Sequence, residues 1–295
     1  MAVVETSTKS SLHLRSNSLP STPHPFTSQF EEHLHRLRDS EATPSSTSSS
    51  INYKLDALQD LHECADKLLQ LPTTQQALAR ECSSKCVDEL LDGSVRILDI
   101  CGTIKDCLLQ QKESMNELES AIRRRRDAEE GFTFESGKYL ASRKQIKKAI
   151  KKALGSLKGF NNELMNSTSN KSNETLSMLS ILKESEVVTV SLLESFLLFI
   201  TGSKEQPKQN RWSIISKLVK PNRVACDSQE ADTNEFEKVD AALMSLINHK
   251  PSSIDNFQSH MENLEMFIQN LEVGVECLSR QVIRTRVSLL NIFNH

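Results

Sequence analysis

The C-terminal segment carries the most constraining pattern in the sequence. Apolar residues recur there at alternating steps of three and four, with Thr285 filling one position, at Ile254, Phe257, Met261, Leu264, Ile268, Leu271, Val275, Leu278, Val282, Leu289 and Ile292. This heptad spacing forms one stripe along a helix, and the stripe must be buried against other helices. The pattern therefore predicts a long helix over 254–292, with Ser252 and Asp255 as its capping signal.

Three apolar residues near the C-terminus, Ile283, Val287 and Leu290, lie outside this stripe. We therefore expect the last turns to be buried on more than one side, which favours a multi-helix bundle over an isolated two-stranded coil. A preceding apolar pattern from Phe236 to Ile247 predicts the antiparallel neighbour of this helix, reached through a short turn at 249–252.

The chain from Ile51 onward shows helical periodicity throughout. No proline occurs between Pro72 and Pro207, so nothing there removes a backbone donor from a long helix. Aromatic residues make up only 5% of the chain, which leaves Leu, Ile, Val and Met to fill the core. We predict an all-α fold, a single multi-helix bundle domain of long antiparallel, coiled-coil-like helices over 51–295, with helices at 51–69, 75–80, 84–126, 136–165 and 174–200.

The most apolar run of the sequence, Val187 to Ile200, has Glu194 as its one charged residue. A membrane-spanning helix needs about 20 such residues, and this run is shorter. We therefore predict a helix that is buried on most sides inside the bundle.

Residues 1–50 form a Ser/Thr-rich tail that lacks this periodicity. Ser and Thr fill seven of the nine positions over 42–50, and such a segment buries too little apolar surface to offset the entropy lost on ordering. We predict a disordered tail with one short helical island at 26–38, which docks on the body of the protein or on a partner. The apolar residues of the island are Phe26, Phe30, Leu34 and Leu37.

The N-terminal residues also bear on the cellular compartment. Charges at Glu5, Lys9 and Arg15 interrupt the stretch where a secretory signal needs an apolar core, and the acidic residues of 31–41 argue against a plastid transit peptide. The seven cysteines are odd in number and lie in apolar patterns, as reduced core thiols do. We predict a cytoplasmic protein, free or peripheral at a membrane, with nuclear and plastid locations less favoured.

Sequence signatures of catalysis are missing. There is no glycine-rich phosphate loop and no G-x-S-x-G elbow. His62 and Glu63 begin like a zinc-protease motif, but Asp66 holds the place of the second histidine, so we expect His62 to be a surface histidine. Cys82 and Cys86 lie one turn apart without a second pair at zinc spacing and are expected in the core. We assign no catalytic, cofactor-binding or metal residue and predict that the protein is not an enzyme.

Basic residues are concentrated in one part of the chain. Residues 136–158 carry a charge of +8 with no acidic residue, on a segment whose apolar residues recur at helical spacing. An unbroken arginine run precedes it. The candidate anionic-surface patch comprises Arg123, Arg124, Arg125, Arg126, Arg143, Lys144, Lys147, Lys148, Lys151 and Lys152.

Four interpretations of this basic amphipathic helix remain open. Its apolar stripe packs on the bundle while the lysines are merely solvated; or the lysines bind an anionic membrane or phosphoinositide surface. A third interpretation is a calmodulin-type target helix. The last is nuclear import or nucleic-acid binding, and the lack of interleaved aromatic residues counts against base stacking.

The tail holds a second candidate site. Arg15 lies three residues before Ser18, and Pro20 follows two residues after it, an arrangement read by phosphoserine-binding adaptors of the 14-3-3 type. A phosphate on Ser18 would add the charge that an arginine cluster recognises. We therefore include such an adaptor among the expected protein partners.

Several stretches together resemble the plant BYPASS-type family. They are RSNSLPSTPHPF (15–26), EEHLHRLR (31–38), LLDGSVRILDICGTIKD (90–106), RRRR (123–126), KYLASRKQIKKAIKK (138–152), RWSIISKLV (211–219) and the C-terminal heptads. The resemblance implies a helical plant protein associated with root and shoot development, in some members through restraint of a mobile root-derived signal. It implies no catalytic residues.

Two hypotheses of different classes follow. The first is a non-enzymatic interaction protein whose bundle presents the basic helix and whose tail is a phosphorylatable docking strand. The second is an enzyme or small-molecule binder of plant signal metabolism, with a pocket walled by Val187 to Ile200 and the cysteine-bearing helix. A deep cavity with ionisable groups from several helices would favour the second hypothesis, and a solid core would count against it.

Overall fold

The structure is a computed structural model that describes residues 24–41, 47–81, 83–124, 129–168, 178–202, 234–248 and 254–294. These residues form eight α helices and no strand, which confirms the predicted all-α fold. The helices are α1 (Pro25–Glu41), α2 (Ser48–Leu69), α3 (Pro72–Glu81), α4 (Ser84–Arg124), α5 (Glu129–Thr168), α6 (Met178–Thr201), α7 (Glu235–Ile247) and α8 (Ile254–Phe293).

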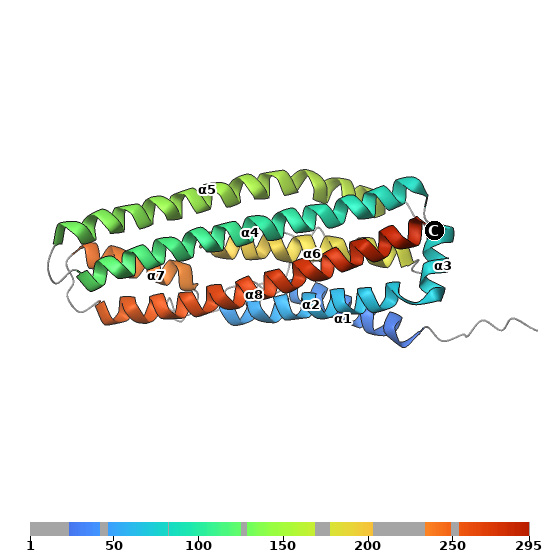
Figure 1. Ribbon diagram of the computed structural model, residues 1–295, viewed down its shortest axis with the longest axis horizontal. Coiled ribbons are helices and arrows are strands. Elements are labelled where there is room, and N and C mark those ends of the chain that lie inside the picture. The colour runs from blue at the N-terminus through green and yellow to red at the C-terminus, as the bar shows by residue number, and fades with distance from the viewer. Residues whose placement is uncertain are drawn as a thin grey trace, which may run out of the picture.

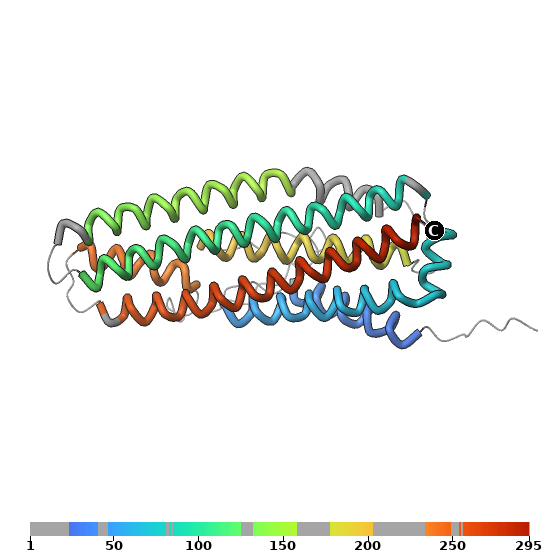
Figure 2. The backbone as a smooth tube through the Cα atoms, viewed as in Figure 1, coloured from blue at the N-terminus to red at the C-terminus, as the bar shows by residue number. Residues whose placement is uncertain are grey.

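The helices form an elongated bundle (Figure 1). The long helices α4, α5 and α8 lie along its axis, and α4 runs antiparallel to the other two (Figure 2). The short α3 crosses one end of the bundle, between α2 and the start of α4. The start of α7 lies beside the end of α6 in space. Asn234, the N-cap of α7, donates from its Nδ2 to the carbonyl of Phe199 on α6 at 2.7 Å.

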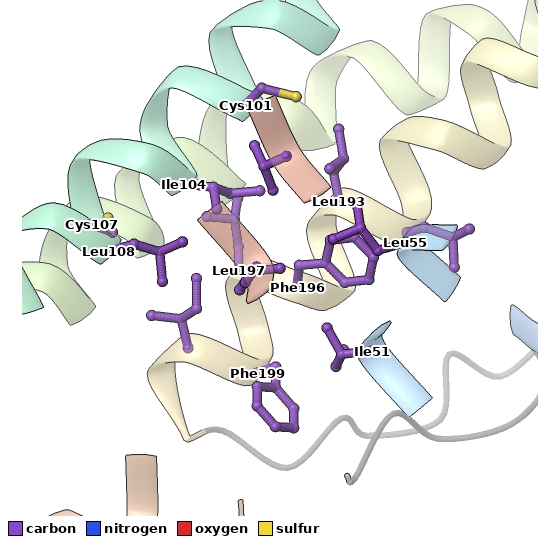
Figure 3. Close-up of a cluster of buried hydrophobic side chains, with 14 of the residues drawn as sticks. Ile51, Leu55, Cys101, Ile104, Cys107, Leu108, Leu193, Phe196, Leu197 and Phe199 are labelled. Carbon is purple, nitrogen blue, oxygen red and sulfur yellow. The ribbon is translucent and has the colours of Figure 1, made fainter. Parts of the chain in front are cut away.

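Helix α6 lies at the centre of the bundle. It contacts α1, α2, α3, α4 and α5, and seventeen of its 24 residues are buried. Phe196 and Leu197 pack there against Ile104 and Leu108 of α4 (Figure 3). The predicted burial of the run from Val187 to Ile200 is therefore confirmed. Among the described helices, none is long and apolar enough to cross a membrane.

Helix α1 corresponds to the apolar island of the tail. Its residues Phe30, Leu34 and Leu37 are buried in the main core, and the helix packs on α2 and α6. The island is thus a helix docked on the body of the protein, longer than the predicted 26–38. Disorder was predicted for the rest of the tail over 1–50. Residues 1–23 and 42–46 lie outside the described part of the chain, whereas residues 48–50 form the first turn of α2.

Helix α8 buries the heptad stripe as expected, with Phe257, Leu264 and Leu271 fully enclosed. The expectation for its last turns was wrong in part, because Ile283 and Val287 are 48% and 49% exposed. They lie off the stripe, and no other described helix covers that side of α8. A second difference concerns α5, which begins at Glu129 rather than near 136. Phe132 in its first turns is buried, so packing outweighs the weak helix preference of the nearby glycines.

Two glycines allow neighbouring helices to approach closely. A Cβ on Gly274 of α8 would lie 2.8 Å from Cγ of Leu55 on α2, well inside van der Waals contact. A Cβ on Gly93 of α4 would overlap the carboxylate of Glu186, a buried residue of α6. The close contacts of α8 with α2 and of α4 with α6 therefore depend on positions without a side chain.

Candidate functional site

The basic segment forms the middle of α5, and its two sides have different environments. The apolar residues Tyr139, Ile146, Ile150 and Leu157 are buried, and they pack into the main core of the bundle. Their successive steps of seven, four and seven residues keep them on one side of the helix. The opposite side is left to solvent, and the lysines lie there.

We call the exposed basic side of α5 the lysine face. Its members are Lys144, Lys147, Lys148, Lys151 and Lys152, and each of them is exposed. Lys147 has one acidic neighbour, with its Nζ 3.4 Å from Oδ2 of Asp240. The other four form no ion pair with any described residue. The face therefore presents positive charge that the rest of the described chain neutralises only at one edge.

Arg143 does not belong to this face, and its place in the predicted patch was wrong. Its side chain is 3% exposed and lies against α6 and α7. Position 143 is one turn from Tyr139 and close to one turn from Ile146, which places it on the buried side of the helix. The buried guanidinium instead binds Asp240, with 3.1 Å between Nε and Oδ1.

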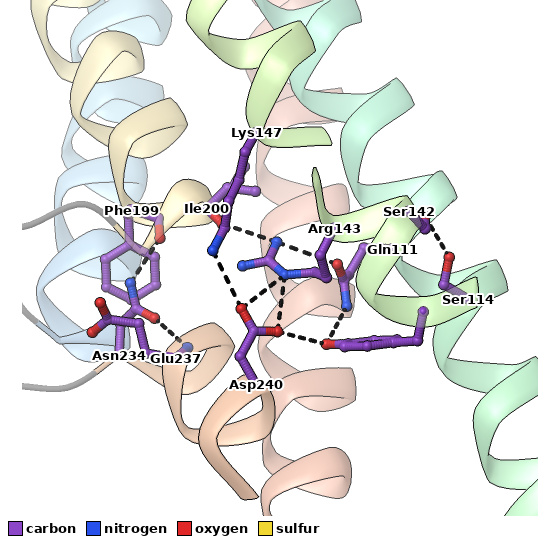
Figure 4. Close-up of polar contacts among 11 residues, drawn as sticks. Gln111, Ser114, Ser142, Arg143, Lys147, Phe199, Ile200, Asn234, Glu237 and Asp240 are labelled. Atoms are coloured by element: carbon purple, nitrogen blue, oxygen red, sulfur yellow. Dashed lines mark hydrogen bonds and ion pairs between the residues drawn. The ribbon is translucent and has the colours of Figure 1, made fainter. Parts of the chain in front are cut away.

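The buried arginine is the centre of a polar network that joins four helices (Figure 4). Its Nη1 donates to Oε1 of Gln111 at 3.3 Å and to the carbonyl of Ile200 at 3.1 Å. The Nε2 of Gln111 donates to the hydroxyl of Tyr139 at 3.1 Å, and that hydroxyl donates to Oδ1 of Asp240 at 3.3 Å. The network therefore fixes α5 against α4, α6 and α7 and holds the lysine face in place.

The environment of Tyr139 suits a structural role. Burial, with the Asp240 carboxylate nearby, raises the pKa of the phenol, so it remains a protonated hydrogen-bond donor. The Arg143 guanidinium also lies over the ring of Phe236, 5.1 Å from its centroid. Sequence reasoning missed Asp240 and Gln111 because the network joins helices far apart in the chain. The one available signal was the polar Gln111 within an apolar heptad stripe.

The arginine run is separate from the lysine face. Arg123 and Arg124 are exposed at the end of α4, and Arg123 pairs with Glu119, whereas Arg125 and Arg126 lie outside the described residues. Ser114 of α4 lies level with Ser142 of α5, their hydroxyl oxygens 2.6 Å apart. Arg123 follows Ser114 on α4, and Lys144 follows Ser142 on α5. Because the two helices are antiparallel, these residues lie in opposite directions from the shared level, roughly 16 Å apart along the axis at 1.5 Å per residue.

The tail motif lies outside the described part of the chain. Arg15, Ser18 and Pro20 fall within 1–23, outside the described residues. The proposed adaptor site is therefore a prediction from sequence.

His62 is a buried residue, contrary to the expectation of a surface histidine. Its Nε2 lies 2.9 Å from Oγ1 of Thr189 on α6. The Thr189 hydroxyl donates to the carbonyl of Ser185, so Nε2 of His62 is the donor to Thr189. Burial lowers the pKa of His62 from 6.5 to about 4, which keeps the ring neutral. Within the described part of the chain, no cluster of three His, Cys, Asp or Glu side chains could hold a metal ion.

The pocket expected between α6 and the cysteine-bearing helix is filled by side chains. Leu193 and Phe196 of α6 pack with Cys101 and Ile104 of α4 in one continuous core (Figure 3). Burial raises the pKa of the Cys101 thiol to about 11, and the same holds for Cys107. These thiols are unreactive core residues. This solid core counts against the hypothesis of a ligand pocket at this place.

One family model matches most of the described bundle. The family model described as Protein BPS1 matches residues 54–292, from the first turns of α2 to the last turn of α8. No curated protein and no solved structure matches the chain. The match spans the helices that carry the lysine face and the network beneath it. The chain therefore belongs to the plant BYPASS-type family, whose family model is described as Protein BPS1.

Proposed function

We propose that this chain is a non-catalytic regulatory protein of root and shoot development, and that its lysine face binds the anionic surface of a membrane. Membership of the BYPASS-type family supports the plant context. The developmental role rests on the resemblance to that family. The place of action in this proposal is the cytoplasm, at the periphery of a membrane.

One observation carries the membrane proposal. The lysine face is exposed while the apolar side of the same helix is used by the core. An amphipathic helix that inserts into a bilayer needs its apolar side free, so α5 would bind from the outside, through charge alone. Basic residues near an anionic membrane contribute about 1 kcal/mol each, so five of them are sufficient for reversible association.

The same geometry argues against a calmodulin-type interaction. Calmodulin encloses the apolar anchors of a target helix, and in α5 those anchors are Ile146 and Ile150. Both are fully buried in the bundle. Calmodulin would therefore have to extract α5 from the core, whereas a membrane needs only the outer side.

The proposal is tested with the full chain and two kinds of vesicle. One kind contains phosphatidylcholine alone, and in the other part of it is replaced by phosphatidylserine. We expect co-sedimentation with the anionic vesicles only, and a steep decrease as added salt screens the surface potential. Equal binding to both kinds of vesicle, or binding that is insensitive to salt, would contradict the proposal.

The regulatory role has its own test. Proximity labelling in root tissue, with the protein and with a variant in which the five lysines of the lysine face are Gln, identifies partners without a prior guess about chemistry. We expect membrane-associated proteins to be labelled by the unchanged protein and to be lost with the variant. Labelling of the same proteins by both would refute a role for the lysine face.

A further inference from the structure

Apolar side chains gather at the surface where α4 and α8 meet. Lys105 of α4 and Glu276 of α8 pair across this boundary at 2.8 Å, and both side chains are 41% exposed, so the pair marks its solvent side. Leu98 lies two turns before Lys105 on the same side of α4. Ile283 lies two turns after Glu276 on the same side of α8. Because the helices are antiparallel (Figure 2), Leu98 and Ile283 lie opposite each other on the solvent side of the boundary.

The apolar surface extends one turn further along both helices. Nη1 of Arg286 donates to the hydroxyl of Ser94 at 2.9 Å, which places these two residues at one level of the bundle. Val287 and Val95, the next residue on each helix, therefore share a level as well. Val95 is 38% exposed, Ile283 48% and Val287 49%. We call the whole group the apolar patch, and with its half-buried leucines it comprises Leu91, Val95, Leu98, Ile283, Val287 and Leu290.

The two edges of the apolar patch carry opposite charges. The α4 edge has three exposed acidic residues, Asp88, Asp92 and Asp99, and none of them forms an ion pair with another described residue. The α8 edge has the exposed Arg280 and Arg284, and α8 contains no acidic residue after Glu276. An exposed apolar group of this kind, bordered by charge, is typical of a protein–protein interface.

We infer that a second copy of this chain covers the apolar patch, related to the first by a two-fold axis along the boundary between α4 and α8. Such an axis keeps every residue at its level and exchanges the two sides, so α4 of one copy lies on α8 of the other. Val95 then meets Val287 of the second copy, because these residues share a level. The negative edge of each copy likewise meets the positive edge of the other.

The levels of the charged residues fit this arrangement. Asp99 lies one residue from Leu98, and Arg280 lies three residues from Ile283 in the same axial direction. Their levels therefore differ by about 3 Å at 1.5 Å per residue, so Asp99 meets Arg280 of the second copy. A two-fold axis across the boundary would lay α4 on α4 and oppose the two acidic edges. The charges therefore select the axis along the boundary.

The dimer goes beyond the proposed membrane binding, because no residue of α5 belongs to the apolar patch. Sedimentation velocity of the full chain without vesicles, across a wide range of concentration, tests it. We expect a concentration-dependent equilibrium between monomer and dimer, since a two-fold interface closes on itself. A monomer at every concentration, or growth into larger oligomers, would overturn the inference and would leave the vesicle experiment unaffected.

Apolar variants locate the interface. Ile283→Asn and Val287→Asn should each weaken the dimer by about tenfold or more, because each change removes apolar burial from both copies. The matched control is Met244→Asn on α7, which replaces an apolar side chain of similar exposure, 46%, outside the patch. All three positions are exposed, so the melting temperatures of the variants should stay close to that of the unchanged protein. Unchanged dimerisation of both patch variants would overturn the inference.

Exchange of charges tests the symmetry. Asp99→Lys and Arg280→Glu should each weaken the dimer by about tenfold or more, because like charges then meet twice in each homodimer. An equimolar mixture of the two variants should dimerise about as tightly as the unchanged protein, because the new lysine meets the new glutamate and the other contact is unchanged. Asp56→Lys, at an exposed position of α2, is the control and should leave dimerisation intact. A mixture that dimerises no better than its components would overturn the inference.

Discussion

Arg143 of α5 and Asp240 of α7 form an ion pair, although the two residues are 97 positions apart in the chain. The two sides of the pair are unequally buried, because the Arg143 side chain is 3% exposed and that of Asp240 is 21% exposed. The guanidinium therefore depends on the carboxylate to neutralise its charge, because water reaches it less than it reaches Asp240. This relationship fixes how α7 lies against the bundle.

Removing the carboxylate should be more damaging than removing the guanidinium. Asp240→Ala leaves a buried cation without its partner, and we expect the free energy of unfolding to fall by about 3–5 kcal/mol. Arg143→Met should cost less, because the Asp240 carboxylate can turn to water and the methionine fills part of the space. Urea denaturation measures both, with Lys148→Gln as the control for an exposed charge that is not paired with Asp240. An effect of Asp240→Ala no larger than that of the control would contradict the structural account.

The buried His62 predicts a dependence of stability on pH. Its pKa is lowered from 6.5 to about 4 in the folded protein, so between these values the unfolded chain binds the proton and the folded chain does not. Stability is therefore fully present above pH 6.5 and falls as the pH decreases toward 4, by about 3 kcal/mol in total. His62→Gln should remove this loss, and urea denaturation of both proteins across the range measures the difference. Parallel curves for the two proteins would refute the assignment.

Glu186 predicts the opposite sign. Burial raises its pKa well above the ordinary 4.5, although Lys183 and Arg96 act against this. Above pH 4.5 the unfolded chain loses this proton while the folded chain keeps it, so stability falls as the pH rises through that range. Gln resembles the protonated acid in shape. The stability of Glu186→Gln relative to the unchanged protein should therefore increase from pH 4.5 to neutral pH, and a decrease would show that the carboxylate is charged in the fold.

The glycine contacts give a prediction with a matched control. Gly274→Ala places a methyl group against the buried Leu55, and we expect the resulting overpacking to destabilise the protein by about 1–2 kcal/mol. Gly155→Ala meets nothing within 4 Å on the exposed side of α5, so it should stabilise the helix by about 0.5–1 kcal/mol. Thermal unfolding of the two variants compares them. A stabilising Gly274→Ala would show that α2 and α8 can separate at no cost.

The helices and their buried sides were predictable, because apolar residues recur periodically in the sequence. The heptads of α8 and the apolar run of α6 each report which side of a helix is buried, and that information lies within one segment. The same rule failed for Ile283 and Val287, since an apolar residue is tolerated at the surface when no helix covers it. The rule does place Arg143 on the buried side of α5, through its spacing from Tyr139 and Ile146. It cannot identify the partner, because Asp240 lies on another helix and no local spacing relates the two residues.

The lysine face was predictable in part. Its exposed lysines lie opposite an apolar stripe that the sequence already displays. The groove between α2, α7 and α8 was not predictable, because the residues that line it, among them Asn52, Glu235 and Asn270, meet only through the packing of these helices. Each of these residues alone has the sequence context of an ordinary surface side chain.

The most direct measurement of the central claim is vesicle binding by a protein in which Lys144, Lys147, Lys148, Lys151 and Lys152 are all replaced by Gln. Its matched control replaces five exposed basic residues elsewhere by Gln, namely Arg36, Arg80, Lys85, Arg280 and Arg284. Both variants change the net charge equally, and both should keep nearly the melting temperature of the unchanged protein, because exposed charges contribute little to folding. We predict that the control binds phosphatidylserine-containing vesicles almost as the unchanged protein does, and that the lysine-face variant does not bind. Equal binding by the two variants would contradict the account.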